Sequence, residues 1–442
     1  MLTGKRTLKD LSFSNNDTEG SIMNLIDRCS TFVGRAVLQR QITRSPATFE
    51  ALKAQQDVIR FWAEHSMHWS EFISNGTIVM LEKFYESADS YSGHPGGLGI
   101  FNAKFFQKLF NRNEYHFTQF SLSHLSDFLK GCQAFVSLLD QGIALPELLQ
   151  KTLKEMSAFL EHRLTNELLK FDKDTSFKEM VQLSFHARRE MKANVQQLIA
   201  HYASLDAWYG MALATIENNW HFPELAVQND TCLIAKGLYH PLLSNAVQYD
   251  ISFTEGKNFM LLTGANMSGK TTLMRALGVS AILAHLGMGV PAEEMKISFL
   301  DGVITNMHVE DDLLKGESFF LAEVKSIRST AESVVNSGSQ LVLMDELFKG
   351  TNVHDAYECT KAIVEGLLQH PKHIMILSTH LHEVARHFEH QKGLSFYCFS
   401  TTLGKDGNFE FSYQLKPGIS DERIGYKILV KEGIVAILNS HS

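Results

Sequence analysis

The sequence of 442 residues has few cysteines, no long apolar run and no excess of positive charge. Its five cysteines lie far apart without a Cys-x-x-Cys pair, which is typical of reduced thiols and indicates neither disulfides nor zinc. No window approaches about eighteen uninterrupted apolar residues, so we expect no membrane span. The first residues, MLTGKRTLKDLSF, lack the apolar core of a signal peptide, and we therefore expect a cytoplasmic protein.

The charge balance also limits the kind of partner. A protein that grips nucleic acid over a broad face is usually basic. Here 41 Lys and Arg residues stand against 49 Asp and Glu residues, which gives a formal net charge of −8. We therefore expect any contact with DNA to be local or weak. The composition is otherwise that of a globular protein long enough for two or three domains.

The spacing of apolar residues along the sequence changes near residues 221–225. Before this point apolar residues recur every three or four positions, which predicts an all-helical domain over residues 1–222. After it, short apolar runs alternate with helical patterns, which predicts an α/β domain with a mainly parallel sheet over residues 223–442. The glycine-rich stretch at residues 90–101 is interpreted as a surface loop, because no Lys-Ser/Thr pair follows it.

The stretch LLTGANMSGKTTLMRAL, residues 261–277, contains the pattern of a phosphate-binding loop. Gly264, Gly269, Lys270 and Thr271 fit Gly-x-x-x-x-Gly-Lys-Ser/Thr between a predicted buried strand and a predicted helix. Glycines let backbone N–H groups turn toward phosphate oxygens, and the helix adds its positive N-terminal end. Lys270 is expected to reach the β- and γ-phosphates of ATP, and the Thr271 hydroxyl to bind Mg²⁺. The alternative is an ordinary glycine turn.

Two further predicted strands supply groups that hydrolysis needs. QLVLMDE, residues 340–346, ends in two acids, of which Asp345 would bind Mg²⁺ and Glu346 would orient and deprotonate the attacking water. HIMILSTH ends in His380, which can hydrogen-bond the γ-phosphate or its water. The alternatives are a solvated acidic turn and an ordinary histidine among twenty.

Between these strands the sequence predicts one more helix. Ser318 precedes it and is a natural N-cap. One interpretation is an ordinary capped helix, and the other is a helix N-terminus that presents hydroxyl and N–H groups to a phosphate. Steps of four and three residues predict a single apolar face, formed by Phe320, Val324, Ile327, Ala331 and Val334.

Together these stretches resemble the ATPase domain of the MutS family, the mismatch-repair relatives of the ABC ATPases. The resemblance rests on TGANMSGKTT, DDLLKGESFFLAE, LVLMDELFKGTN and STHLHE in this order, and on GLYHPLL, where Tyr239 replaces the family's arginine. In the first half, STFVGRAVLQRQITRSPATFEALKAQQDVIRFW looks like the core helical domain, and LDAWYGMALATIENNWHFPEL looks like the lever helix. The resemblance covers nearly the whole chain and is most specific over residues 235–385.

The resemblance implies ATP and Mg²⁺ as cofactors and assigns roles to matching positions. The implied catalytic residues are Glu346, Lys270 and His380, and the implied metal ligands are Thr271 and Asp345. Tyr413 would stack on adenine. The nucleotide would also contact the loop residues Gly264, Ala265, Asn266, Met267, Ser268, Gly269, Lys270, Thr271 and Thr272.

The resemblance further implies a homodimer with composite ATP sites. Ser318 would reach the ATP of the other subunit, and Gly350, Thr351 and Asn352 would form a loop that touches it. Full-length relatives carry a mismatch-reading domain and a connector ahead of the core, whereas core-like sequence begins here almost at Met1. The end of the chain, EGIVAILNSHS, leaves little room for the helices that brace the family's dimer. We therefore expect a short form of the family.

The sequence thus predicts an ATP-driven dimeric switch in which an all-helical lever domain precedes a P-loop, ABC-type ATPase domain. We expect association with DNA in mismatch repair or recombination, weak and without mismatch specificity. Candidate contacts are Arg188, Arg189 and Lys192, unless they form a solvated helix face. A switch acting on a protein or ribonucleoprotein, and a nucleotide-binding scaffold without turnover, stay open as alternatives. An ABC transporter subunit is disfavoured, because a transporter would have no fused lever domain.

Overall fold

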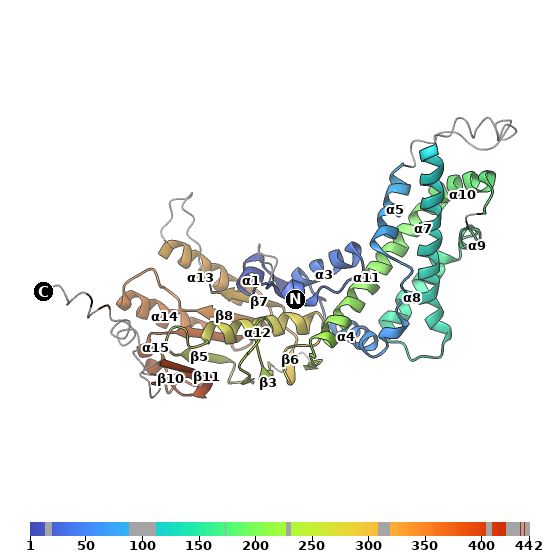
Figure 1. The fold of residues 1–442 in the computed structure, drawn as a ribbon. Helices are drawn as coiled ribbons and strands as arrows, with labels where there is room; N and C mark the ends of the chain where they lie inside the picture. Colours follow the sequence, from blue (N-terminus) through green and yellow to red (C-terminus); the bar gives the residue numbers. More distant parts are fainter. Residues whose placement is uncertain are drawn as a thin grey trace. The chain divides into compact units, whose positions relative to one another are not determined.

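The computed structural model describes residues 1–13, 20–87, 112–172, 174–226, 231–307, 319–403 and 409–420, together with 434 and 437 (Figure 1). The chain forms two compact units. Unit 1 contains Met1–Ile26, Gln41–Lys53 and Thr215–Ser442, and unit 2 contains Asp27–Arg40 and Ala54–Ala214. The sequence predicts a single boundary near residue 222, whereas the structure groups the first residues of the chain with the C-terminal part.

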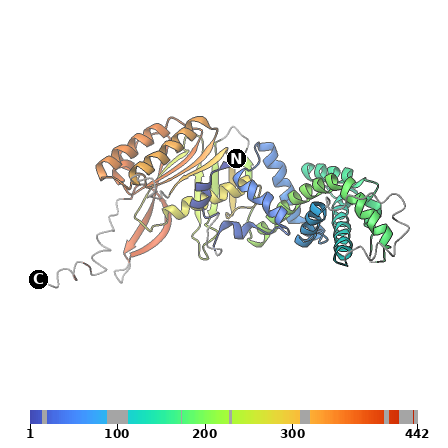
Figure 2. The ribbon, with the colours of Figure 1, turned by 90° about the horizontal axis from the view of Figure 1, so that it is seen from above.

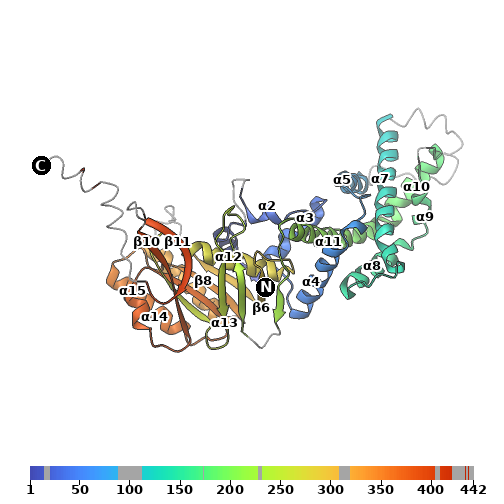
Figure 3. The ribbon, with the colours of Figure 1, turned by 60° about the horizontal axis from the view of Figure 1, so that its bottom comes forward.

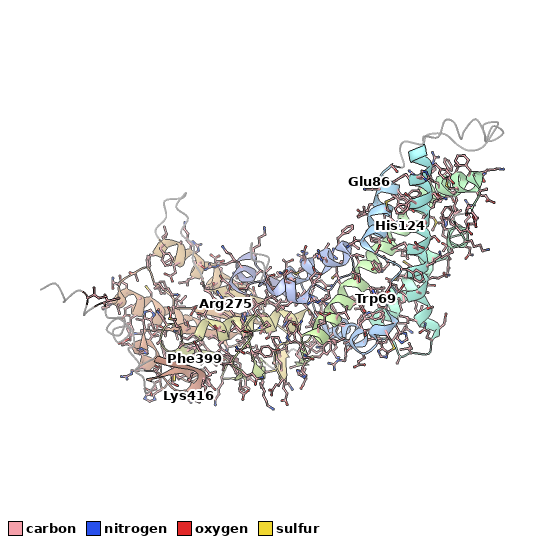
Figure 4. All side chains as sticks on the ribbon, in the orientation of Figure 1. Trp69, Glu86, His124, Arg275, Phe399 and Lys416 are labelled. Carbon is pink, nitrogen blue, oxygen red and sulfur yellow. The ribbon has the colours of Figure 1, made fainter. Side chains whose placement is uncertain are left out.

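Unit 2 is built from helices, as its three- and four-residue apolar spacing predicts. Trp69, labelled in Figure 4, stacks on Tyr209 with ring centroids 4.1 Å apart. The buried Asp206 accepts hydrogen bonds from the backbone N–H groups of Ser30 and Thr31, and the Thr31 hydroxyl in turn caps the helix that follows by accepting from the Gly34 N–H. The helices are α3 (Phe32–Thr43) and α4 (Phe49–Glu64), which continue into unit 1, α5 (Asn75–Glu86), α7 (Arg112–Val136), α8 (Glu147–Leu160), α9 (Thr165–Leu169), α10 (Phe177–Glu190) and α11 (Lys192–Glu217).

Unit 1 contains a seven-stranded sheet with the order β1-β7-β8-β9-β5-β10-β11. All neighbouring strands are parallel except the terminal pair β10–β11, so the prediction of a mainly parallel sheet is confirmed. Figure 3 shows the hairpin β10–β11 in red at one end of this sheet. The strands are β1 (Leu2–Thr3), β5 (Phe259–Thr263), β7 (Gly302–Asn306), β8 (Gln340–Asp345), β9 (Ile374–Thr379), β10 (Leu394–Leu403) and β11 (Phe409–Pro417).

The central strands β5, β8 and β9 are buried along their whole length, as parallel strands are when helices cover both faces of a sheet. Alternate residues of these strands pack on α13 (Phe319–Asn336), α14 (Val353–Leu367) and α15 (His382–His387). Figure 2 shows the orange helices α13 and α14 along one face of the sheet. Leu343 points to the opposite face, toward Gly278 of α12 (Lys270–His285).

A second sheet of four strands has the order β2-β6-β3-β4. Its strands are β2 (Glu224–Ala226), β3 (Leu233–Leu238), β4 (Tyr249–Phe253) and β6 (Glu294–Ser298). The sequence predicts one sheet and does not separate this second one. No helix in the described ranges is long and apolar enough to cross a membrane.

The N-terminal residues are part of unit 1. Strand β1 extends the edge of the large sheet by pairing in parallel with β7, and α1 (Lys5–Asp10) follows it. The buried Asp10 accepts a hydrogen bond of 2.6 Å from the Thr305 hydroxyl at the end of β7. Arg6 donates to Asn306 at 2.8 Å and to the Ser326 hydroxyl of α13. These contacts fix the first helix of the chain against β7 and α13.

The helix α12 ends at a fully buried histidine that is neutral in the folded state. The Nδ1–H group of His285 donates to the Ala281 carbonyl at 2.8 Å, and its Nε2 accepts from the Leu300 N–H at 2.8 Å. A second ring proton would occupy the position where the Leu300 N–H points. Burial accordingly lowers the pKa of His285 to about 4.

We predict that His285 makes unit 1 sensitive to acid. The unfolded chain binds a proton near pH 6.5 and the folded chain only near pH 4, so the free energy of unfolding should fall as the pH drops through this interval. In His285→Gln, urea titrations should show a smaller fall over the same interval, by roughly 3 kcal/mol at most. The control His390→Gln, at an exposed position, should keep the parent pH dependence. An unchanged pH dependence in His285→Gln would contradict this assignment.

Candidate nucleotide site

The loop between β5 and α12 has a backbone that only small residues adopt easily. Gly264 and Gly269 have φ values of +144° and +107°, in the region that favours glycine. A Cβ atom at Gly264 would lie 3.2 Å from the carbonyl oxygen of Phe399, which is labelled in Figure 4. Gly269 is the N-cap of α12 and has no side chain to accept from the first N–H groups of the helix. The loop therefore leaves a helix N-terminus open to an anion.

The ammonium group of Lys270 lies inside this loop. Its Nζ donates to the carbonyl oxygens of Gly264 at 2.8 Å and Ala265 at 2.9 Å. The same atom lies 3.2 Å from Oε1 of Glu346, which follows β8. The Lys270 side chain is only 4% exposed, so its charge is held almost entirely by these three oxygens.

Asp345 lies at the carboxyl end of β8 between two hydroxyl groups. The Thr271 hydroxyl donates to Oδ2 of Asp345 at 2.6 Å, and the Ser378 hydroxyl of β9 donates to Oδ1. Mg²⁺ binds through one or two protein oxygens together with phosphates and water. The residues Thr271 and Asp345 therefore fit such an ion. Ser378 was not identified from the sequence.

The carboxylate of Glu346 faces the side chains of two lysines and a histidine. Lys349 Nζ lies 3.3 Å from Oε2, and His380 Nδ1 lies 3.9 Å from the same oxygen. Burial alone would raise the pKa of Glu346, but Lys270 and Lys349 outweigh it and hold the pKa below its ordinary value. Glu346 is therefore ionised at neutral pH. Its φ of +52° is unusual for a residue with a side chain.

One cavity of about 590 Å³ lies beside Lys270, Asp345 and Glu346, a volume in the range of small-molecule sites, and Gly264, Ala265 and His380 are not among the residues that line it. The predicted residues that line it are Asn266, Met267, Ser268, Gly269, Lys270, Thr271, Thr272, Asp345, Glu346 and Tyr413. The structure thus brings the loop, the end of β8 and the C-terminal hairpin together around one space.

The tyrosine of the C-terminal hairpin lies next to the loop. The Tyr413 Cδ1 atom is 3.3 Å from where a Cβ would stand on Gly269. Tyr413 is 40% exposed and has a φ of +49°. Its ring is therefore accessible from the cavity, as a stacking surface must be.

One wall of the cavity was not predicted. It comes from the segment between β3 and β4, and its lining residues are His240, Leu243, Asn245, Ala246, Val247 and Tyr249. Burial and the nearby Arg275 lower the pKa of His240 to about 4, so its ring is neutral. The stretch GLYHPLL marks the start of this wall, but only the fold shows that it faces the loop. Lys349 also lines the cavity and was not predicted as a site residue.

The helix predicted after Ser318 is present as α13, but its buried face differs from the prediction. Ile327 and Val334 are buried as expected, whereas Val324 is 37% exposed and Ala331 is exposed. The buried face turns instead toward Glu323, which binds the backbone after β8, and Thr330. Ser318 itself lies outside the described residues.

The loop after Glu346 leads directly into α14. Asn352 caps α14, because its side-chain oxygen accepts from the Asp355 N–H at 3.0 Å. A Cβ atom at Gly350 would lie 2.7 Å from the ring of Phe319. A small residue is therefore required at Gly350 within this subunit, and the role of this loop toward a partner stays a prediction.

The basic helix suggested for DNA contact is a poor phosphate-binding face. Arg188 is only 6% exposed; its guanidinium lies 4.3 Å from the ring centre of Phe84 and donates to Ser87. The prediction that Arg188 contacts DNA is therefore wrong. Arg189 and Lys192 are exposed, although Lys192 also donates to a backbone carbonyl at 3.4 Å.

The chain is similar to curated DNA mismatch repair proteins. The family described as MutS domain V matches residues 260–437. The chain is 27% identical to DNA mismatch repair protein MutS of Halalkalibacterium halodurans over 254 residues, which cover 56% of this chain and 29% of that protein. It is 30% identical to the protein of the same name from Anaplasma phagocytophilum over 229 residues, 51% of this chain and 27% of that protein.

A longer match, at 27% identity over 299 residues, is to the MutS protein of Clostridium kluyveri and covers 64% of this chain and 34% of the relative. The chain thus spans about a third or less of the length of these relatives. The match includes the loop, the acidic end of β8 and His380, which the fold brings to one site. Residues 260–437 thus match the MutS domain V, and the chain is similar to MutS proteins over about half of its length.

Proposed function

We propose that this chain binds ATP with Mg²⁺ in the cavity at Lys270 and hydrolyses the terminal phosphate. We further propose that unit 1 is a P-loop ATPase domain of the ABC type. One observation carries the proposal. At the start of α12 and the end of β8, a hydrogen bond joins Thr271 to Asp345 and an ion pair joins Lys270 to Glu346, and all four residues line one cavity.

The loop residues would bind the phosphates of ATP. Lys270 would exchange its contacts to the Gly264 and Ala265 carbonyls and to Glu346 for phosphate oxygens, which carry more negative charge. The backbone N–H groups at the start of α12 would complete the anion site. Thr271 and Asp345 would hold Mg²⁺, which neutralises charge on the phosphates when it is bound.

Glu346 would orient the attacking water and accept its proton. Its lowered pKa keeps the carboxylate ionised at neutral pH, so it is ready to accept a hydrogen bond from water. Once Lys270 turns to the phosphate, the ammonium group of Lys349 and the ring of His380 still face Glu346. His380 would then lie where it can contact the terminal phosphate or the water.

The output of hydrolysis would be a conformational switch in a homodimer. In this proposal Ser318 of one subunit completes the ATP site of the other. Because the relatives are named for DNA mismatch repair, the first candidate substrate is DNA, in mismatch repair or recombination. The second candidate is a protein or ribonucleoprotein partner, which the net charge of −8 and the burial of Arg188 favour. A scaffold without turnover is disfavoured, because Asp345 and Glu346 are both in place.

We predict that binding and hydrolysis separate in two variants. Glu346→Gln keeps the size of the side chain but removes the base, so phosphate release should fall roughly 10²-fold or more while ATP stays bound. Lys270→Ala should instead lose affinity for ATP, measured by titration of a fluorescent analogue. Glu358→Gln, on the exposed part of α14, serves as the control and should match the parent. Hydrolysis at the parent rate in Glu346→Gln would show that Glu346 is not the base.

We predict weak DNA binding with little preference for mismatches. With Arg188 buried, contacts by Arg189 and Lys192 would give a log–log salt slope of only about −2. The preference for a mismatched over a matched duplex should be less than about 1 kcal/mol, below a typical specific base contact. Titration of both duplexes at several salt concentrations, with and without ATP, measures both quantities. A tenfold mismatch preference, or a slope several times steeper, would contradict this prediction and favour DNA as the true substrate.

A further inference from the structure

Glu323 of α13 is a buried carboxylate that binds the backbone just after the proposed base. It is 4% exposed, and its Oε1 accepts from the N–H of Phe348 at 2.6 Å and from the N–H of Lys349 at 3.4 Å. Its Oε2 is also buried and has no hydrogen-bond partner within the described ranges. A carboxylate is costly to bury, so its presence here indicates a specific requirement for an acceptor at these two amides.

The segment that Glu323 binds has an unusual backbone. Glu346 and Phe348 have φ values of +52° and +62°, although neither is glycine. Such conformations are strained for residues with a side chain and persist only where neighbouring groups enforce them. They place the Glu346 carboxylate toward Lys270 instead of continuing the direction of β8.

Two hydrogen-bonding groups hold this turn from opposite sides of Glu346. On the β9 side, the Glu346 N–H donates to the Ser378 carbonyl at 3.0 Å. On the α13 side, Glu323 accepts from the two amides that follow, and the ring of Phe348 packs near Phe320 with centroids 6.1 Å apart. The first contact belongs to the rigid sheet. The second comes from a helix that is tied to the sheet by side chains.

The position of α13 is itself set by a polar network. The Ser326 hydroxyl donates to Asn306 at 2.6 Å, and Arg6 of α1 donates to both residues. Asn306 also donates to the Thr330 hydroxyl at 3.4 Å. The end of β7, the N-terminal helix and α13 are therefore fixed together on the side of α13 that carries Glu323.

We propose that Glu323 is a positioning residue for the base Glu346, and that it transmits the position of α13 to the ATP site. Glu323 does not line the cavity, so it acts through the Phe348 and Lys349 amides and not on the nucleotide. Movement of α13 by about 1 Å would lengthen both hydrogen bonds beyond their useful range. The proposal rests on the proposed function, because it assigns Glu346 as the base.

The test compares Glu323→Ala with Glu323→Gln by single-turnover hydrolysis and ATP affinity. Glu323→Gln keeps an oxygen that can accept from both amides, and its rate should stay within about threefold of the parent. Glu323→Ala removes the acceptor, and its hydrolysis rate should fall roughly 10- to 100-fold while the affinity for ATP changes less than about threefold. In a Glu346→Gln background, Glu323→Ala should cause no further loss of rate.

The control Val334→Ala removes buried volume from the same face of α13 and should lower stability without a change in the hydrolysis rate. A folded Glu323→Ala protein with the parent rate, or one that loses ATP affinity instead of rate, would overturn the proposal. Amide hydrogen exchange at Phe348 and Lys349 gives a readout that needs no hydrolysis, and it should accelerate at least tenfold in Glu323→Ala. If the parent hydrolyses no ATP, the proposed function fails, while this exchange still decides whether Glu323 holds the turn.

Discussion

The ion pair between Lys270 and Glu346 links the two parts on which the site depends. It joins the loop that precedes α12 to the residue that follows β8, with Nζ and Oε1 3.2 Å apart. Both side chains are largely buried, so removal of one would leave the other charge uncompensated. A ligand that replaces this pair must therefore supply negative charge to Lys270, as a phosphate does. In the proposed function, the same exchange would free the Glu346 carboxylate for water.

The surrounding fold explains why these groups meet. The carboxyl ends of parallel strands lie at one edge of a sheet, and ligands bind in the crevice outside that edge. Strands β8, β9 and β5 are adjacent, so Asp345, Ser378 and the loop after Thr263 are neighbours in space although they lie far apart in the sequence. The N-terminal strand and helix add an outer edge beyond β7 and help to fix α13.

The central elements of the site could be predicted because their signals are local. The glycine spacing before Lys270 and the acids after an apolar strand need only a few adjacent residues to be recognised. Other features depend on contacts between distant segments. The pairing of Leu2 with Gly302 gives no local pattern, and neither does the wall near His240. Apolar spacing also misjudged α13, because the buried acceptor Glu323 counts as a surface residue in such a pattern. Arg188 was misjudged for the same reason.

The central claim is that Lys270 exchanges its ion pair with Glu346 for a contact to an ATP phosphate. A crystal structure with Mg²⁺ and a non-hydrolysable ATP analogue tests this most directly. The account predicts that Lys270 Nζ binds phosphate oxygens and leaves Glu346, and that Mg²⁺ lies between Thr271 and Asp345. It also predicts that the adenine ring lies against the wall formed by residues 243–249. An analogue bound elsewhere, or bound here with Lys270 still paired to Glu346, would contradict the account.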